Sequence, residues 1–316
     1  MNLTNLTNLT NPTNLATTTT LVAEVALALH PILLKQVNTN LPTQLLARLG
    51  SYSALSASFA SSKEITEVWG SIPSTLKYIG FGLMNLVHIS SSYISYKHLP
   101  AGSALALFYT YPFMNIIASS LFLGEAMDWK TLPLMLVAFA GVLMIANATH
   151  DEEDSKEKSK EGFEETQGEK PKEKHNITLG VIMSLLSAFT ETLIFMVAKT
   201  ASAETQTPWG PILKLYPGAL AALLAWVFGT GQSFDFSSKT WVPLLLFNVF
   251  VGFLGYSLRF FSIPLLSTSV FSLLTFIGVA AGYAWGLMYA KEVPSLSALA
   301  GAGLITGSLA FLKGKY

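Results

Sequence analysis

The stretch Leu99–Glu125, LPAGSALALFYTYPFMNIIASSLFLGE, decides the fold. No charged residue stands between Ala101 and Leu123, and this run is long enough to cross a hydrocarbon core of about 30 Å as a helix. The stretch opens on a Leu-Pro-Ala turn, carries Pro112 in its middle and closes on a Gly-Glu pair. A proline inside a membrane helix is tolerated where neighbouring helices satisfy the freed carbonyl, so Pro112 predicts a kink beside a cavity.

A second stretch repeats this design. Leu266–Glu292, LSTSVFSLLTFIGVAAGYAWGLMYAKE, has the same 27 residues at an offset of 167, so Glu292 corresponds to Glu125. The segments that follow agree as well, because Gly141 in AFAGVLMI finds Gly307 in LITGSLAF after a shift of one residue. The sequence therefore predicts two copies of one unit.

The composition is typical of an integral membrane protein. Apolar residues make up 51% of the chain and charged residues 12%, with a formal net charge of zero. There is no basic excess, which argues against a nucleic-acid partner, and there are no cysteines, which excludes disulfides, thiolate metal sites and cysteine nucleophiles. The N-terminus lacks a basic n-region, so we expect no cleaved signal peptide.

Ten apolar spans separated by short polar or proline-bearing turns are predicted. They run over residues 16–37, 43–60, 74–96, 101–123, 131–147, 177–199, 209–229, 241–262, 265–290 and 294–312. Five spans per half is an odd number, so the second copy must insert upside down relative to the first. The predicted fold class is an all-α polytopic membrane protein, with ten transmembrane helices in two inverted five-helix repeats. Such folds place the substrate near the midplane of the membrane, between the repeats.

The predicted domain organisation follows these spans. Residues 1–15 form an Asn/Thr-rich tail that we expect to be disordered. The first repeat covers residues 16–149 and the second covers residues 176–316. Between them, residues 150–175 hold ten of the nineteen acids and almost no apolar residue, which predicts a solvated charged linker.

Two acidic residues lie well inside predicted spans. They are Glu24 in LVAEVALALHP and Glu191 in SAFTETLIFMVAK, and an offset of 167 separates them too. A charge at mid-membrane costs about 2.5–3.5 kcal/mol on insertion scales, so such residues usually face a polar cavity or a partner. The hypothesis is substrate contact or proton coupling. The alternative is a structural ion pair or a protonated, hydrogen-bonded carboxyl.

Two bases also repeat. Arg48 stands six residues after Pro42, and Lys214 stands six residues after Pro208. These bases could anchor their helices by reaching toward the headgroups. The alternatives are attraction of an anionic substrate and pairing with the two glutamates.

Polar side chains form a stripe on the third helix of each unit, Asn85, His88, Ser92 and Tyr96 in one and Asn248, Gly252, Tyr256 and Arg259 in the other. Such a stripe either lines a cavity or joins helices by hydrogen bonds. We expect Asn85, His88, Tyr111, Asn248, Tyr256 and Arg259 to line one water-accessible cavity.

The fourth helix adds Tyr111 and Asn115 around Pro112 as candidate substrate contacts. Its partner helix has Val279 in place of the proline, which argues against symmetric motion. Glycines at 278, 282 and 286, like those at 303 and 307, are expected to be packing surfaces.

The order of turn, mid-span proline and closing Gly-Glu resembles the fourth helix of the drug/metabolite transporter superfamily, in its EamA-like branch. The proline followed six residues later by a base resembles another feature of that family. The resemblance covers nearly all of residues 16–312. It implies ten helices, both termini in the cytoplasm and transport of small molecules, whereas the lysine and arginine counts on the two sides do not decide the orientation.

The predicted function is a secondary transporter that moves a small polar organic metabolite by alternating access, with proton coupling as a hypothesis. A sugar-phosphate or nucleotide-sugar antiporter would use Lys214 and Arg259 as anion contacts, but the paired lysine–arginine motifs of those branches are absent. A non-transporting scaffold or receptor is the other alternative. No catalytic signature is present, so we expect no enzyme, no metal and no cofactor. The expected partners are a small-molecule substrate and the bilayer, with a homodimer left open.

Overall fold

The computed structural model describes residues 11–99, 101–161, 176–205, 207–290 and 295–313, and the regular structure in these ranges is helical. The helices of the first half are α2 (Pro12–Leu27), α3 (His30–Lys35), α4 (Leu41–Phe59), α5 (Ser62–Trp69), α6 (Ile72–His98), α7 (Ala101–Phe108), α8 (Tyr111–Phe122) and α9 (Leu132–Glu161). Those of the second half are α10 (Ile177–Thr205), α11 (Gly210–Thr230), α12 (Ser238–Phe247), the π-helix η1 (Asn248–Phe253), α13 (Leu254–Ser262), the 3₁₀ turn η2 (Ile263–Leu265), α14 (Thr268–Thr275), α15 (Ile277–Trp285), the π-helix η3 (Gly286–Ala290) and α16 (Leu296–Lys313).

Helices occur at each of the predicted spans, but they differ in how well they suit a membrane. In the described part of the chain, five helical segments are long and apolar enough to cross one. They are Ala104–Phe122, Ile177–Thr200, Gly210–Thr230, Ser238–Leu265 and Thr268–Tyr289. Leu132–Asn147 and Leu296–Phe311 are shorter apolar helices. The first three predicted spans are helical without meeting these criteria of length and hydropathy.

Both ends of the first repeat differ from the prediction. The tail was expected to reach residue 15, but α2 begins at Pro12, where the side chain of Asn11 caps it by accepting a hydrogen bond from the backbone N–H of Thr13. At the other end, α9 runs on to Glu161 and so includes the first part of the predicted linker. Residues 1–10 and 162–175 lie outside the described residues.

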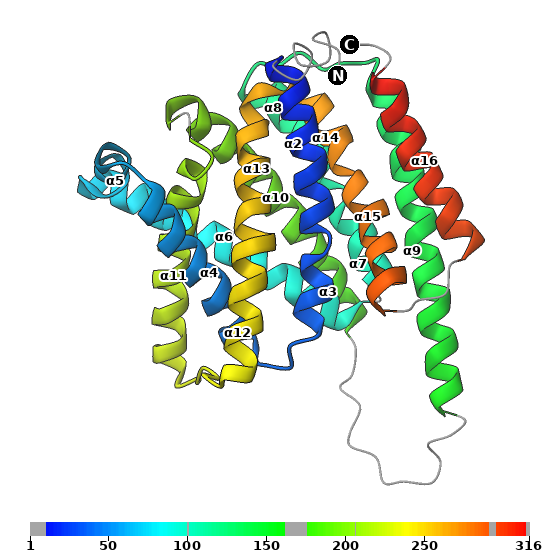
Figure 1. Cartoon of the computed structure of the whole chain (residues 1–316), viewed down its shortest axis with the longest axis horizontal. Coiled ribbons are helices and arrows are strands. Elements are labelled where there is room, and N and C mark those ends of the chain that lie inside the picture. The colour runs from blue at the N-terminus through cyan, green and yellow to red at the C-terminus, as the bar shows by residue number, and fades with distance from the viewer. Residues whose placement is uncertain (1–10, 100, 162–175, 206, 291–294, 314–316) are drawn as a thin grey trace, which may run out of the picture.

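The helices form one bundle (Figure 1). The start of α2 and the end of α16 lie at one end of it, and the end of α9 lies at the opposite end. Within the bundle, α2 packs against α13, and α6 packs against both α10 and α11. At one side of it, α9 packs against α16 (Figure 1).

Close helix crossings depend on glycine. A Cβ atom on Gly82 of α6 would lie 2.3 Å from the backbone nitrogen of Ala219 in α11, and one on Gly141 of α9 would lie 2.5 Å from the carbonyl oxygen of Gly301 in α16. The expected packing role of Gly303 and Gly307 is wrong, because a Cβ atom on either would meet nothing within 4 Å. The packing glycine of α16 is Gly301.

The helices are interrupted at corresponding points of the two halves. α7 ends at Phe108 and α8 begins at Tyr111, just before Pro112, as the proline predicted. α14 ends at Thr275 and α15 begins at Ile277, so the second half is broken at the same place without a proline. The expectation drawn from Val279 concerned motion, and it stays a prediction.

The short helix α5 was not predicted. A capping box starts it, in which Ser61 and the side chain of Glu64 satisfy each other's backbone N–H groups. Glu64 also accepts a hydrogen bond from Thr207, and Glu67 pairs with Lys214 at 2.7 Å. These contacts fix α5 to the start of α11.

Candidate functional site

A buried ion network lies at the centre of the bundle, and Arg259 of α13 is its hub. Its Nε lies 3.1 Å from Oε1 of Glu24 in α2, and its Nη2 lies 2.7 Å from Oε1 of Glu191 in α10. The same Nη2 donates a hydrogen bond to the hydroxyl of Tyr111 in α8 at 3.2 Å. The side chains of both glutamates and of Arg259 are almost fully buried. The structure thus brings two carboxylates from the two halves onto one guanidinium.

His88 of α6 extends the network on the far side of Glu191. Its Nε2 lies 3.3 Å from Oε2 of Glu191, and its Nδ1 lies 3.1 Å from the carbonyl oxygen of Ser187. A carbonyl only accepts, so Nδ1 carries a hydrogen, and the remaining nitrogen faces a carboxylate that also only accepts when ionised. A proton placed between Nε2 of His88 and Oε2 of Glu191 would turn this contact between two acceptors into a hydrogen bond.

Two local features, the end of α2 and a glycine of α15, lie next to the carboxylate of Glu24. α2 ends at Leu27, one turn after Glu24, and a two-residue turn leads into α3. Gly278 of α15 faces the carboxylate, since a Cβ atom there would lie 3.4 Å from Oε2 of Glu24 and 2.6 Å from the hydroxyl of Tyr109. Gly278 was expected to be a packing glycine, and it packs against the network itself.

Arg48 of α4 is a second buried cation, and its surroundings are aromatic. Its Nη2 donates to the hydroxyl of Tyr256 in α13 at 2.9 Å. Its guanidinium carbon lies 5.1 Å from the ring centre of Tyr256 and 5.7 Å from that of Tyr52. The ring of Tyr256 also lies 6.0 Å from the guanidinium carbon of Arg259, so this tyrosine contacts both cations.

Pairing of Arg48 or Lys214 with the two central glutamates was one alternative, and the structure gives that position to Arg259 instead. Lys214 forms an ion pair with Glu67 of α5. The bases at the corresponding sequence positions therefore have different surroundings.

The six residues predicted to line one water-accessible cavity have two kinds of surroundings in the structure, and their shared cavity stays a prediction. His88, Tyr111, Tyr256 and Arg259 meet around the ion network. Asn85 instead donates to the backbone carbonyl of Leu215 at 3.4 Å, which joins α6 to α11. Asn248 contacts His30 at 3.1 Å, which joins η1 to α3. These two asparagines make contacts between helices, which is the kind of contact that the alternative interpretation describes.

Asn115 lies one turn after Tyr111 on α8 and is fully buried. Neither its amide nitrogen nor its amide oxygen has a hydrogen-bond partner among the described residues. The hydroxyl of Ser272 in the facing helix α14 is also unpartnered there, and one turn further Ser119 bonds to Thr268 at 2.9 Å. A polar seam therefore runs between α8 and α14.

An ion pair lies at the end of this seam. Lys199 of α10 contacts Glu125, which follows α8, and Glu125 also accepts hydrogen bonds from the hydroxyl and the backbone N–H of Thr268. Burial by itself raises the pKa of Glu125, but Lys199 and Thr268 outweigh it and hold the pKa below its usual range. Glu125 was predicted only as the end of a helix.

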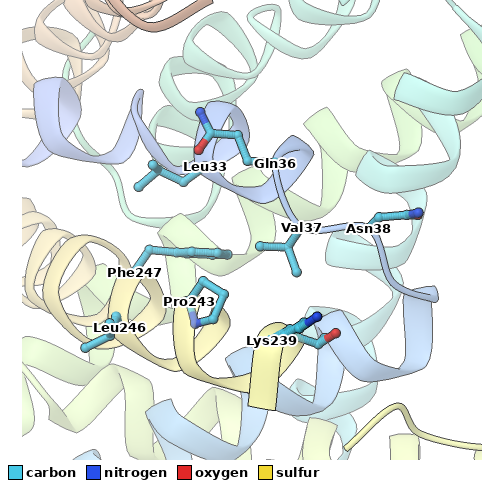
Figure 2. A pocket seen from close by; sticks show the side chains of 9 residues that line it. Leu33, Gln36, Val37, Asn38, Lys239, Pro243, Leu246 and Phe247 are labelled. Atoms are coloured by element: carbon cyan, nitrogen blue, oxygen red, sulfur yellow. The ribbon is translucent and has the colours of Figure 1, made fainter. Parts of the chain in front are cut away.

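A surface pocket of about 550 Å³ lies elsewhere, between α3 and α12 (Figure 2). Leu33, Gln36, Val37 and Asn38 line one side of it, and Lys239, Thr240, Pro243, Leu246 and Phe247 line the other. None of the predicted site residues lines it. Over the described ranges, no group of three or more His, Asp or Glu side chains could hold a metal ion.

Comparison with known proteins agrees with the apolar helices. Residues 11–147 match the EamA-like transporter family. The "Pseudopaline exporter CntI" of Pseudomonas aeruginosa, in two strains, is 26% identical over 231 residues, which are 71% of this chain and 70% of the exporter. A crystal structure with 15% sequence identity has the same fold, with a TM-score of 0.66 over 93% of this chain and 96% of the other.

Proposed function

We propose, from the membership of residues 11–147 in the EamA-like transporter family, that this integral multi-pass membrane transporter is a secondary transporter working by alternating access. The substrate is a small polar organic metabolite. The observation that carries the proposal is the ion network of Glu24, Arg259, Glu191 and His88, because it joins four helices from both halves at the centre of the bundle. Buried charges of this kind are costly, and transporters place them along the substrate or proton path.

The proposed architecture is two inverted five-helix repeats. In that arrangement α2 corresponds to α10, α4 to α11, α6 to α12 and α13, α7 and α8 to α14 and α15, and α9 to α16. Packing supports it because the contacts are reciprocal: α2 packs on α13 and α15, while α10 packs on α6, α7 and α8. The remaining equivalent pairs, α4 with α11 and α9 with α16, pack on each other.

The proposed topology places both termini in the cytoplasm and the charged linker on the opposite side. The opposite positions of the α2 start and the α9 end in Figure 1 support it. The chain has no cysteine, so single cysteines at Ser159 and Lys315 can be labelled with an impermeant thiol reagent in sealed vesicles. Labelling of both from the same side would contradict the ten-span topology.

Proton coupling is proposed for the carboxyls of the network. A proton placed between His88 and Glu191 would neutralise the pair, and its departure would restore a charge next to Arg259. A cycle that loads this proton in one conformation and releases it in the other would couple transport to a proton gradient.

The test is uptake into proteoliposomes of a metabolite first selected by its thermal stabilisation of the purified protein. Glu24→Gln and Glu191→Gln keep the shape and remove the charge change, so we expect gradient-driven uptake to collapse while substrate exchange persists. Glu161→Gln at the end of α9 is the matched control. Full pH-dependent uptake in both variants would show that the carboxyls are structural.

The alternatives have less support. An antiporter that reads phosphate with Lys214 and Arg259 would need both cations, yet Lys214 is paired with Glu67 and Arg259 with two glutamates. A scaffold has no use for a costly buried charge network, and stabilisation by a metabolite would argue against it directly.

A further inference from the structure

The chain contains two arginines, Arg48 and Arg259, and both are buried in the same region of the bundle. Their pairing differs sharply. Arg259 contacts two carboxylates, whereas none of the described carboxylates lies within 4 Å of Arg48, which is 8% exposed. A guanidinium stays protonated at any ordinary pH, so Arg48 is a buried positive charge without a direct counter-ion in the described residues.

Hydrogen-bond donors around Arg48 are also unused. Its Nε has no partner in the described part of the chain, and neither has the hydroxyl of Tyr52 one turn later on α4. Tyr93 of α6 and Tyr216 of α11 also interact electrostatically with the guanidinium. With Tyr256 they complete a tyrosine cage, defined here as Tyr52, Tyr93, Tyr216 and Tyr256.

The cage is held by close packing. The ring centres of Tyr52 and Tyr216 lie 4.7 Å apart, and the ring centres of Tyr52 and Tyr256 lie 6.0 Å apart. The Tyr52 hydroxyl fits against Gly252 of η1, where a Cβ atom would lie only 1.9 Å from it. Any side chain at position 252 would displace this hydroxyl, so Gly252 leaves room for a donor that has no acceptor among the described residues.

An unpaired charge and unpaired donors in one buried place are unfavourable unless a ligand completes them. Burying an ion costs several kcal/mol after relaxation, and a buried donor left unsatisfied costs about 1–3 kcal/mol. We propose that Arg48 and the tyrosine cage bind a carboxylate group of the transported molecule. This inference rests on the proposed transport function and assigns the chemical class of its substrate.

Charge balance favours a carboxylate over a phosphate. Arg48 supplies one positive charge, and Glu191 lies within its electrostatic reach. A monoanion neutralises Arg48, whereas a phosphate dianion would add a second negative charge facing Glu191. The planar guanidinium fork also matches the two oxygens of a carboxylate, and tyrosine hydroxyls can donate to the remaining lone pairs.

Three other buried or half-buried cations of the bundle already have carboxylate partners. Lys214 pairs with Glu67, Lys199 pairs with Glu125, and Arg259 holds both central glutamates. An anion on any of these would have to displace a protein carboxylate first. Arg48 requires no such exchange.

The test uses the purified full-length protein in detergent and matched pairs of small probes. Benzoate is compared with benzamide, and glutarate with glutaramide, by thermal unfolding over a concentration series. Inorganic phosphate is the third kind of probe. We expect the acids to bind at least about tenfold more tightly than their amides, as a charge-assisted hydrogen bond requires.

Three variants assign this preference to the site. Arg48→Gln should abolish the acid-over-amide preference. Tyr52→Phe removes a hydroxyl that bonds to nothing described, so it should fold normally and bind the acids several-fold more weakly. Tyr283→Phe, whose hydroxyl serves Ser295 outside the cage, is the matched control and should bind as the wild type does.

Each outcome decides the proposal. Three binding results would overturn it: equal binding of acid and amide, no binding of either acid, and tighter binding of phosphate than of the acids. A preference for the acids that survives Arg48→Gln would overturn it as well. If Arg48→Gln fails to fold, unchanged acid binding in Tyr52→Phe overturns it. Acid-selective binding without transport in proteoliposomes would leave the Arg48 site standing and refute the transport function. Transport that survives Arg48→Gln would leave the transport function standing and refute the Arg48 site.

Discussion

Replacing Arg259 by glutamine removes the cation that contacts both buried glutamates. Glu191 keeps its contact with His88, so the loss falls mainly on Glu24. Removing one partner of a buried ion pair typically costs about 3–5 kcal/mol, because the other charge remains buried and unpaired. We therefore expect Arg259→Gln to lower the free energy of unfolding by about this amount at pH 7.

Protonation limits the cost and makes it depend on pH. A carboxylate left unpaired can bind a proton, which at pH 7 costs an ordinary glutamate about 3.7 kcal/mol, at about 1.36 kcal/mol per pH unit above its pKa of about 4.3. At pH 5 the same step costs about 1 kcal/mol. The destabilisation of Arg259→Gln relative to the wild type should therefore shrink from about 3–4 kcal/mol at pH 7 to about 1 kcal/mol at pH 5.

The assay is reversible unfolding in mixed micelles titrated with a denaturing detergent, at both pH values. The double variant Arg259→Gln/Glu24→Gln is the control, because it removes the stranded carboxylate and leaves Glu191 on His88. We expect it to recover at least half of the lost free energy at pH 7. A single variant within about 1 kcal/mol of the wild type at pH 7, or a deficit equal at both pH values, would refute the reasoning.

Two further predictions concern the ends and crossings of helices. The pKa of Glu125 lies below its usual range in the folded protein. Its pair with Lys199 therefore stabilises the folded state at pH values above the pKa that Glu125 has in the unfolded chain. This stabilisation is lost as the pH falls through the lower pKa of the folded protein. Glu125→Gln should cost about 1 kcal/mol at pH 7 and flatten the acid side of the stability profile, measured by unfolding from pH 7 to pH 3. Gly141→Ala should cost about 1–3 kcal/mol because its Cβ would meet the Gly301 carbonyl, whereas Gly303→Ala in open space should be neutral or stabilising by up to about 1 kcal/mol. Equal unfolding free energies for the two alanine variants would contradict the assigned crossing.

Much of the helical organisation could be predicted, because long apolar runs and proline are local signals. The predicted spans coincide with helices, and the break before Pro112 was expected. The equivalent break at Phe276 has no proline to announce it, and it depends on tertiary packing. The helix α5 is too short for a hydropathy argument, although Ser61 and Glu64 form a capping box that a search for helix starts could have found.

The sequence indicates which buried residues need a polar partner, but it does not indicate which partner each of them takes. A charge inside an apolar span identifies Glu24, Glu191 and Arg259 as residues that need partners. Which partner each takes depends on the rotation of every helix about its axis, and one sequence does not contain that rotation. Pairing of Arg48 with the glutamates was one alternative suggested by repeat position, yet Arg259 occupies that place. The tyrosine cage was missed except for Tyr256, although Tyr52 stands one helical turn after Arg48 and was a local signal.

We expect the four central charges to link carboxylate binding at Arg48 to proton binding. With both glutamates ionised, Glu24, Glu191 and Arg259 carry a net negative charge, which Arg48 balances from behind Tyr256. A carboxylate on Arg48 would remove that balance and favour a proton on the Glu191–His88 contact, and by reciprocity the proton would strengthen carboxylate binding. Benzoate binding near pH 7 should therefore take up protons from a weakly buffered solution, followed with a pH indicator, and Glu191→Gln should reduce this uptake. Benzoate binding without proton uptake would show that the two events are independent.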